Sequence, residues 1–164
     1  MSTADATVSM TEASVSGKAA GAQQIIKSSC VWAAAAGAVP VPMLDAVAMG
    51  AVQATMVNRI AELYGHSISS EAARSLIAVV LGTILPAGAA SAAVGSGSKF
   101  IPGIGWLVGS AVMGSLGYAA TYAIGKVFVR HFEAGGTPAT FTANSVDKAQ
   151  AADDLKNAKR AADK

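Results

Sequence analysis

The stretch KFIPGIGWLVGSAVMGSLGYAATYAIGK, from Lys99 to Lys126, contains no charged residue between its two terminal lysines. A helix needs about 20 apolar residues to span a bilayer, and this stretch is long enough. Its composition also suits a helix in the core of a bundle. What the sequence predicts about fold and function depends mainly on which of these two environments the stretch occupies.

Charged residues are scarce and unevenly placed in this chain of 164 residues. They make up 13% of the sequence and apolar residues 52%, whereas about 25% charged residues is usual for a soluble domain. Residues 28–58 contain only Asp45, and residues 75–98 and 100–125 contain no charge. The net charge of +2, without a dense basic stripe, predicts that nucleic acid is not a partner.

Proline and glycine divide the chain into segments that predict an all-α fold. Residues 1–17 are rich in Ser and Thr and predict a disordered tail, and residues 18–134 predict one helical domain. Breaks at Pro40-Val41-Pro42 and Pro102-Gly103 give a helical bundle of two helix–proline–helix halves. A flexible charged tail is expected over residues 135–164. Helices are expected over 18–38, 43–64, 71–94 and 105–132.

The second half of the chain favours a membrane hairpin over a soluble core. Ser75–Ser98 and Phe100–Gly125 are each long enough to span a bilayer. Trp106 lies near one end of the second segment and Tyr122 near the other, as in an interfacial aromatic belt. Flanking basic residues predict that both chain ends are cytoplasmic. Lipid is therefore an expected partner, and the cytoplasmic (inner) membrane is the expected location.

A row of glycines predicts a helix-packing face in this stretch. In lipid, small residues at such spacings let two helices approach closely, so a homo-oligomer is expected. The alternative is a soluble bundle that uses these glycines for internal contacts, because each uncompensated glycine costs about 0.5–1 kcal/mol relative to alanine in a helix. The predicted face consists of Gly105, Gly109, Gly114 and Gly117.

The sequence predicts no enzymatic activity, no cofactor and no metal site. Gly17-Lys18 and Gly125-Lys126 lack the other residues of a phosphate-binding P-loop. His66 and His131 have no metal-ligand partner at helical spacing, and Cys30 has no histidine nearby in sequence. A single cysteine also excludes a disulfide within the chain and indicates a reducing compartment.

The expected helix over 43–64 carries two further candidates for function. Asp45 is the only charge in its window, and an ionisable residue in a membrane segment is a functional candidate. Its alternative role is structural, because a carboxylate in the first turn is stabilised by the helix dipole. An apolar stripe with spacings of 3 and 4 residues predicts a partner-binding face. The stripe comprises Met49, Val52, Met56, Ile60 and Leu63.

Several motifs together resemble one bacterial family. They are the Ala-rich run into Pro40-Val41-Pro42 with Asp45, Ile60-Ala61-Glu62-Leu63-Tyr64-Gly65, and Ile101-Pro102-Gly103-Ile104-Gly105 leading to Thr121-Tyr122-Ala123-Ile124-Gly125. Over about residues 19–133 the chain resembles the YcjF-like inner-membrane proteins, a family of unknown function often fused behind small GTPase domains. The resemblance implies an all-helical, membrane-associated module. This chain has no GTPase domain, so the implied GTPase partner would be a separate protein.

These features predict a non-enzymatic, membrane-associated helical protein. Its expected role is an anchor, a scaffold or a membrane-remodelling subunit that works with a separate GTPase. Two alternatives stay open from the sequence. One is a soluble all-helical adaptor that binds a partner helix, and the other is an oligomeric pore lined near Asp45.

Overall fold

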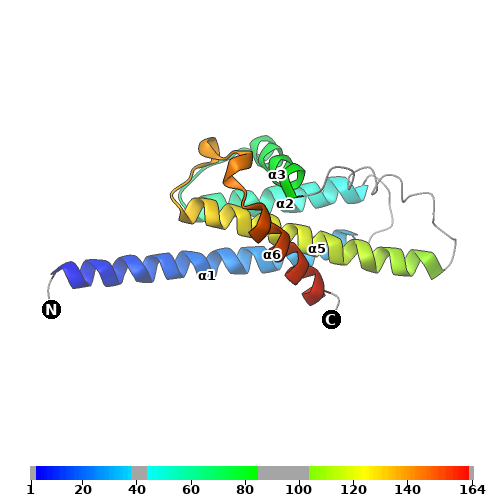
Figure 1. Cartoon of the computed structure of the whole chain (residues 1–164), viewed down its shortest axis with the longest axis horizontal. Helices are drawn as coiled ribbons and strands as arrows, with labels where there is room; N and C mark the ends of the chain where they lie inside the picture. Colours follow the sequence, from blue (N-terminus) through cyan, green and yellow to red (C-terminus); the bar gives the residue numbers. More distant parts are fainter. Residues whose placement is uncertain (1–2, 38–43, 85–103, 163–164) are drawn as a thin grey trace.

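The computed structural model describes residues 3–37, 44–84 and 104–162, and these residues are mainly helical (Figure 1). Two short 3-10 turns, η2 (Pro138–Thr140) and η3 (Ala143–Ser145), precede the last helix. The predicted all-α class is therefore confirmed for the described residues. The longer helices are α1 (Thr3–Gly37), α2 (Leu44–Leu63), α3 (Ser70–Ile84), α5 (Ile104–Glu133) and α6 (Lys148–Ala162).

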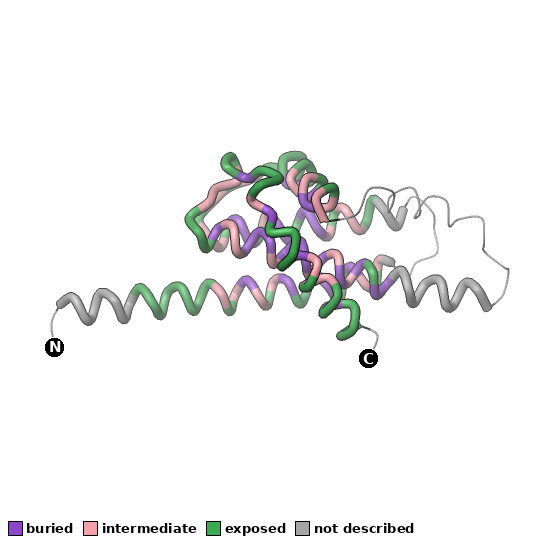
Figure 2. Tube along the Cα trace, viewed as in Figure 1, coloured by how far each residue is buried: buried purple, intermediate pink, exposed green. Residues whose placement is uncertain are grey.

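Three helices, α1, α2 and α5, pack along one another and form the body of the molecule. Helices α2 and α5 run in the same direction, opposite to α1 (Figure 1). Many of the buried residues lie where the three helices face each other (Figure 2), and removal of their apolar surface from water drives this packing. Helix α3 packs mainly on α2, so the two predicted helix–proline–helix halves do not form equivalent pairs. The largest fully buried side chains include Ile26, Met56, Ile60, Ile124 and Phe128.

Two helices end at glycines that adopt a left-handed backbone. Gly65 follows α2 with φ of +85°, and Gly135 follows α5 with φ of +82°. The Gly136 amide donates a hydrogen bond to the His131 carbonyl at 2.9 Å, which closes the Schellman pattern typical of helix C-termini. The predicted end of the second helix at Gly65 is therefore confirmed. Pro40-Val41-Pro42, the predicted break before that helix, lies outside the described residues.

Helix α1 extends further toward the N-terminus than the sequence predicts. Residues 1–17 are expected to be a disordered tail, whereas α1 is one helix of 35 residues that begins at Thr3. At 1.5 Å per residue such a helix is about 50 Å long. Residues 11–18 are all exposed, so this part projects beyond the bundle (Figure 2). The packed half of α1 supplies the helical nucleus from which the exposed half propagates.

The C-terminal segment also differs from its prediction as a flexible tail. Phe141, between the two 3-10 turns, is buried and stacks on Phe128 with ring centroids 4.7 Å apart. Asp147 caps α6 by accepting hydrogen bonds from the amides two and three residues ahead, both at 3.0 Å. Helix α6 then crosses α5 and buries Ala151 and Ala158 (Figure 1). A few apolar residues with distant partners hold a segment that is rich in polar and charged residues.

The structure also changes the interpretation of the predicted membrane hairpin. Residues 85–103, which include its turn and part of its first segment, lie outside the described residues. Within the described ranges, no helix combines the length and the apolarity needed to cross a membrane. The later part of the second segment packs against α1 and α2, and Thr121 and Ile124 are fully buried there. This part of the Lys99–Lys126 stretch is therefore covered by the protein's own helices.

Candidate interaction surface

A groove of about 850 Å³ runs between α1 and α2. Its α1 side extends from Gly21 to Trp32 and its α2 side from Ala51 to Arg59. Small residues, including Gly21, Ser28 and Ala51, are part of its lining. Because α1 and α2 are antiparallel, Trp32 lies at the Ala51 end and Arg59 at the opposite end. The groove is therefore apolar at one end and basic at the other.

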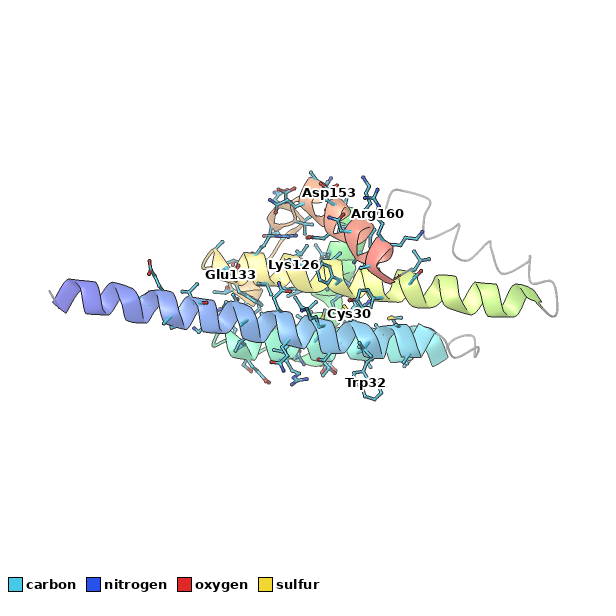
Figure 3. The ribbon with its side chains drawn as sticks, turned by 90° about the horizontal axis from the view of Figure 1, so that it is seen from below. Cys30, Trp32, Lys126, Glu133, Asp153 and Arg160 are labelled. Carbon is cyan, nitrogen blue, oxygen red and sulfur yellow. The ribbon has the colours of Figure 1, made fainter. Side chains whose placement is uncertain are left out.

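Large apolar side chains are exposed near the apolar end of the groove. Trp32 is 68% exposed, Val31 64% and Val47 63%. Figure 3 shows the Trp32 side chain pointing away from the bundle, on the side opposite α6. Single exposed apolar residues are ordinary, whereas contiguous apolar patches are typical of interaction sites. We call Val31, Trp32 and Val47 the apolar tip.

The apolar stripe predicted to bind a partner is instead the core face of α2. Met56 and Ile60 are fully buried within this chain. Met49 lies against Gly117 of α5, and Leu63 lies against α1. Of the five stripe residues, Val52 lines the groove. The partner-binding prediction is corrected because α1 and α5 cover most of this face.

Two of the four predicted packing glycines make contacts inside the chain. A Cβ atom added to Gly117 would lie 2.6 Å from Met49 Cε and 3.2 Å from the Ala33 carbonyl oxygen. A Cβ atom on Gly114 would lie 3.3 Å from another carbonyl oxygen of α1. These distances are shorter than most contacts of real Cβ atoms. Glycine at these two positions therefore lets α5 approach the α1 backbone closely. These two glycines therefore serve the bundle itself, which corrects their assignment to an oligomer face.

The structure does not describe the surroundings of three predicted site residues. Asp45 is the second residue of α2, in the first turn where its structural role was expected, but its side chain is not described. Gly105 and Gly109 belong to the first turns of α5, and their neighbours are not described either. The roles proposed for these residues from the sequence stay predictions.

Sequence reasoning missed two contacts that join α5 to its neighbours. The Gln53 side-chain amide donates a hydrogen bond to Thr121 Oγ1 at 3.3 Å, and both residues are buried between α2 and α5. A Cβ atom on Gly125 would lie 2.6 Å from Ile26 Cγ1 of α1. The apolar surroundings of Gln53 were a signal in the sequence, since a polar residue there needs a partner once it is buried.

The titratable candidates Cys30 and His131 lie in surroundings that give them structural roles. Cys30 is fully buried, and burial raises the pKa of its thiol to about 12, which keeps it protonated and unreactive at neutral pH. The His131 ring lies with Nε2 3.0 Å from the Thr137 carbonyl oxygen, just beyond the end of α5. In the part of the chain that the structure describes, no group of three or more His, Cys, Asp or Glu residues could hold a metal ion.

A polar cluster fixes α6 against α5. Arg130 Nη1 donates a hydrogen bond to Asp154 Oδ2 at 2.7 Å, and both side chains are partly buried. A hollow of about 300 Å³ beside this pair is lined by Arg130, His131 and Asp147, among others. The ion pair joins two helices, so its evident role is to hold α6 in place.

The fold and the exposed surface define a small helical bundle with an open groove and an apolar tip. The chain belongs to the family described as Domain of unknown function (DUF697), whose model matches residues 5–154. Membership of a family of unknown function, expected from the sequence motifs, is thereby confirmed.

The chain is also similar to a protein named Magnetosome membrane protein 22, from Magnetospirillum gryphiswaldense. The two are 42% identical over 115 residues, which cover 70% of this chain and 59% of that relative. The chain thus matches less than two thirds of the relative's length. No solved structure matches the chain.

Proposed function

We propose that this protein is a non-enzymatic, membrane-associated helical protein of the bacterial inner membrane that acts as an anchor or scaffold. The observation that carries the proposal is its 42% identity to a protein named for a membrane. Two features of the chain support it. Charge is low throughout the sequence, at 13% of residues, and Trp32 is exposed although it is large and apolar.

The non-enzymatic role is supported by the surroundings of three candidate reactive groups. Cys30 is enclosed and protonated. His131 lies on a backbone carbonyl, and Arg130 is paired with Asp154. Each of these groups has a structural use, and none faces the α1–α2 groove.

The direct test is fractionation of the expressed chain, followed by flotation with phospholipid vesicles. We expect the chain to sediment with membranes and to float with vesicles. Release by alkaline carbonate would identify a peripheral anchor, and release by detergent alone an integral one. A monodisperse chain in the soluble fraction that does not float would contradict the proposal and favour the adaptor alternative.

Self-association and remodelling belong to the same proposal. Gly105 and Gly109 keep the GxxxG spacing at the start of α5, which supports close contact between copies. We expect Gly105→Leu and Gly109→Leu to reduce cross-linked oligomers in membranes. The matched control is Gly82→Leu, because a Cβ atom at Gly82 meets nothing within 4 Å. Equal oligomer yields from all three variants would remove this part of the proposal.

A separate GTPase is the partner implied by the family resemblance. The experiment is co-purification of the tagged chain from its native membranes, followed by measurement of GTP hydrolysis in the eluate. Activity that depends on the tagged chain would support the partnership. Equal activity in an eluate from untagged cells would remove the GTPase from the proposal.

A further inference from the structure

Polarity changes along the exposed face that α1 and α2 share. On α2, the exposed positions Val47, Ala51, Thr55 and Arg59 follow one another at spacings of 4 residues. From Val47 to Arg59, these side chains change from apolar through neutral polar to charged. Over the 8 residues from Ala51 to Arg59 a helix rises about 12 Å. This side of α2 is therefore apolar at its N-terminal end and basic further along.

The exposed face of α1 follows the same order in the opposite chain direction. Val31, Trp32 and Ala35 are exposed near its C-terminal end, and Ser28 and Lys27 are exposed in the preceding turn. Because the helices are antiparallel, the apolar ends of both faces lie at the same end of the bundle (Figure 1). Lys27 and Arg59 therefore both lie on the same side of the apolar tip along the bundle axis.

Helix α6, which carries Asp153 and Asp154, lies elsewhere. Figure 3 shows Asp153 and Arg160 of α6 on the opposite side of the bundle from Trp32. Between Lys27 and Arg59 the sequence has one acidic residue, Asp45, whose side chain is not described. Glu62 is exposed on α2 beyond Arg59, further from the apolar tip. The face combines an apolar tip with two cations, Lys27 about one helical turn from Val31 and Arg59 about three turns from Val47.

We propose that this face docks on the surface of an anionic phospholipid bilayer, with the apolar tip in the acyl boundary and Lys27 and Arg59 at the phosphates. The proposal rests on the proposed membrane association and specifies how it occurs. Interfacial segments bury apolar groups about 5–10 Å below the headgroups and keep cations at the headgroup level. Tryptophan is also the side chain favoured at this boundary.

The first experiment follows the fluorescence of Trp32 in the full chain. The only other tryptophan is Trp106, so the Trp106→Phe variant reports on Trp32 alone. Vesicles are made of phosphatidylcholine with phosphatidylglycerol, with or without brominated acyl chains. We expect a blue shift of Trp32 emission on vesicle binding and quenching by the brominated lipid. Flotation of the variant without either change would overturn docking by this face and leave membrane association intact. Failure of the variant to float at all would contradict both docking by this face and membrane association itself.

Substitutions then separate the face from the rest of the surface. Trp32→Ser with Val47→Ser should weaken vesicle binding at least about tenfold, because burial of these side chains is worth more than 1.4 kcal/mol. The matched control is Val15→Ser, which removes a valine that is 54% exposed on the projecting half of α1. The control should bind as the parent chain does. Equal loss in both variants would overturn the proposal.

A second variant and its control test the role of the two cations. Lys27→Glu with Arg59→Glu should abolish the preference for phosphatidylglycerol over pure phosphatidylcholine vesicles. Lys156→Glu on α6, whose side chain is 70% exposed, should leave that preference unchanged. Retention of the preference in the double variant, or its loss in the Lys156 variant, would contradict the proposed orientation.

Discussion

Arg130 of α5 and Asp154 of α6 form an ion pair of 2.7 Å with side chains that are only 32% and 20% exposed. It joins the central helix to a segment that the sequence alone predicts to be free. Charge-assisted hydrogen bonds in partly buried positions contribute more than exposed pairs, because solvent screens them less. The ion pair therefore contributes to holding α6 against α5.

We expect Arg130→Met to lower the free energy of unfolding by about 1–2 kcal/mol, since it leaves Asp154 without its partner. Urea denaturation followed by circular dichroism measures this change. Lys156→Met is the control, because Lys156 and Asp153 are 3.9 Å apart and more than two thirds exposed. That variant should change stability by less than about 0.5 kcal/mol. Equal effects would mean that the Arg130 pair contributes no more than a surface contact.

Glycine substitutions should separate close contacts from open positions. Gly117→Val should lower the free energy of unfolding by about 1–3 kcal/mol, because the added atoms overlap Met49 and the α1 backbone. Gly82→Ala in α3 meets open space and should raise stability by about 0.5–1 kcal/mol. Thermal melts of both variants would measure the difference. A neutral Gly117→Val would show that α5 does not approach α1 as closely as the structure has it.

The stacking contact between Phe141 and Phe128 should contribute strongly to the stability of the fold. Phe141 is buried and stacks on Phe128, so Phe141→Ala should cost about 3 kcal/mol or more. Hydrogen exchange should also become faster throughout α6, because the turns that position it lose their anchor. Unchanged exchange in α6 would mean that Arg130 and the buried alanines hold this helix by themselves.

Stability should fall at alkaline pH through Tyr64. Burial, a 3.0 Å hydrogen bond to Glu133 and the charge of that carboxylate raise the pKa of Tyr64 to about 12, from an ordinary value of about 10. Between these values the unfolded chain loses the phenolic proton while the folded chain keeps it, so unfolding becomes more favourable as pH rises. Below pH 10 the full contribution is present.

The Tyr64→Phe variant should therefore lose less stability than the parent chain between pH 10 and pH 12. Urea denaturation at several pH values measures the two slopes. Cys30 also has a raised pKa and contributes to the decline in both chains equally, so the difference between the slopes belongs to Tyr64. Parallel slopes would contradict the raised pKa of Tyr64 in the folded chain.

The helices could be predicted because their signals are local. The expected helices over 43–64 and 105–132 agree closely with Leu44–Leu63 and Ile104–Glu133, since glycine and proline limit both. The C-terminal segment could not be predicted in this way. Phe141 and Val146 are isolated in a polar sequence, and their burial depends on Phe128 and other residues already folded. Such contacts leave no periodic pattern.

The candidate surface was only partly predictable for a related reason. Small-residue spacing at Gly114 and Gly117 predicts close helix packing but does not distinguish a second copy from α1 of the same chain. Likewise, the apolar stripe of α2 predicts a covered face without naming what covers it. Trp32 was predicted as part of a helix, but its exposure follows from the way α1 and α2 pack, which the sequence does not specify.

The exposed half of α1 has a consequence for the dynamics of the molecule. A free peptide of that length is marginally helical in water, because nucleating a helix is unfavourable. Here the nucleus lies in the packed half near Ala22 and Ile26, and the helix grows outward from it. Protection of backbone amides from exchange should therefore decay gradually from Ala22 toward Thr3, without a sharp boundary. The projecting half is therefore an extension whose order depends on the packed half of the helix.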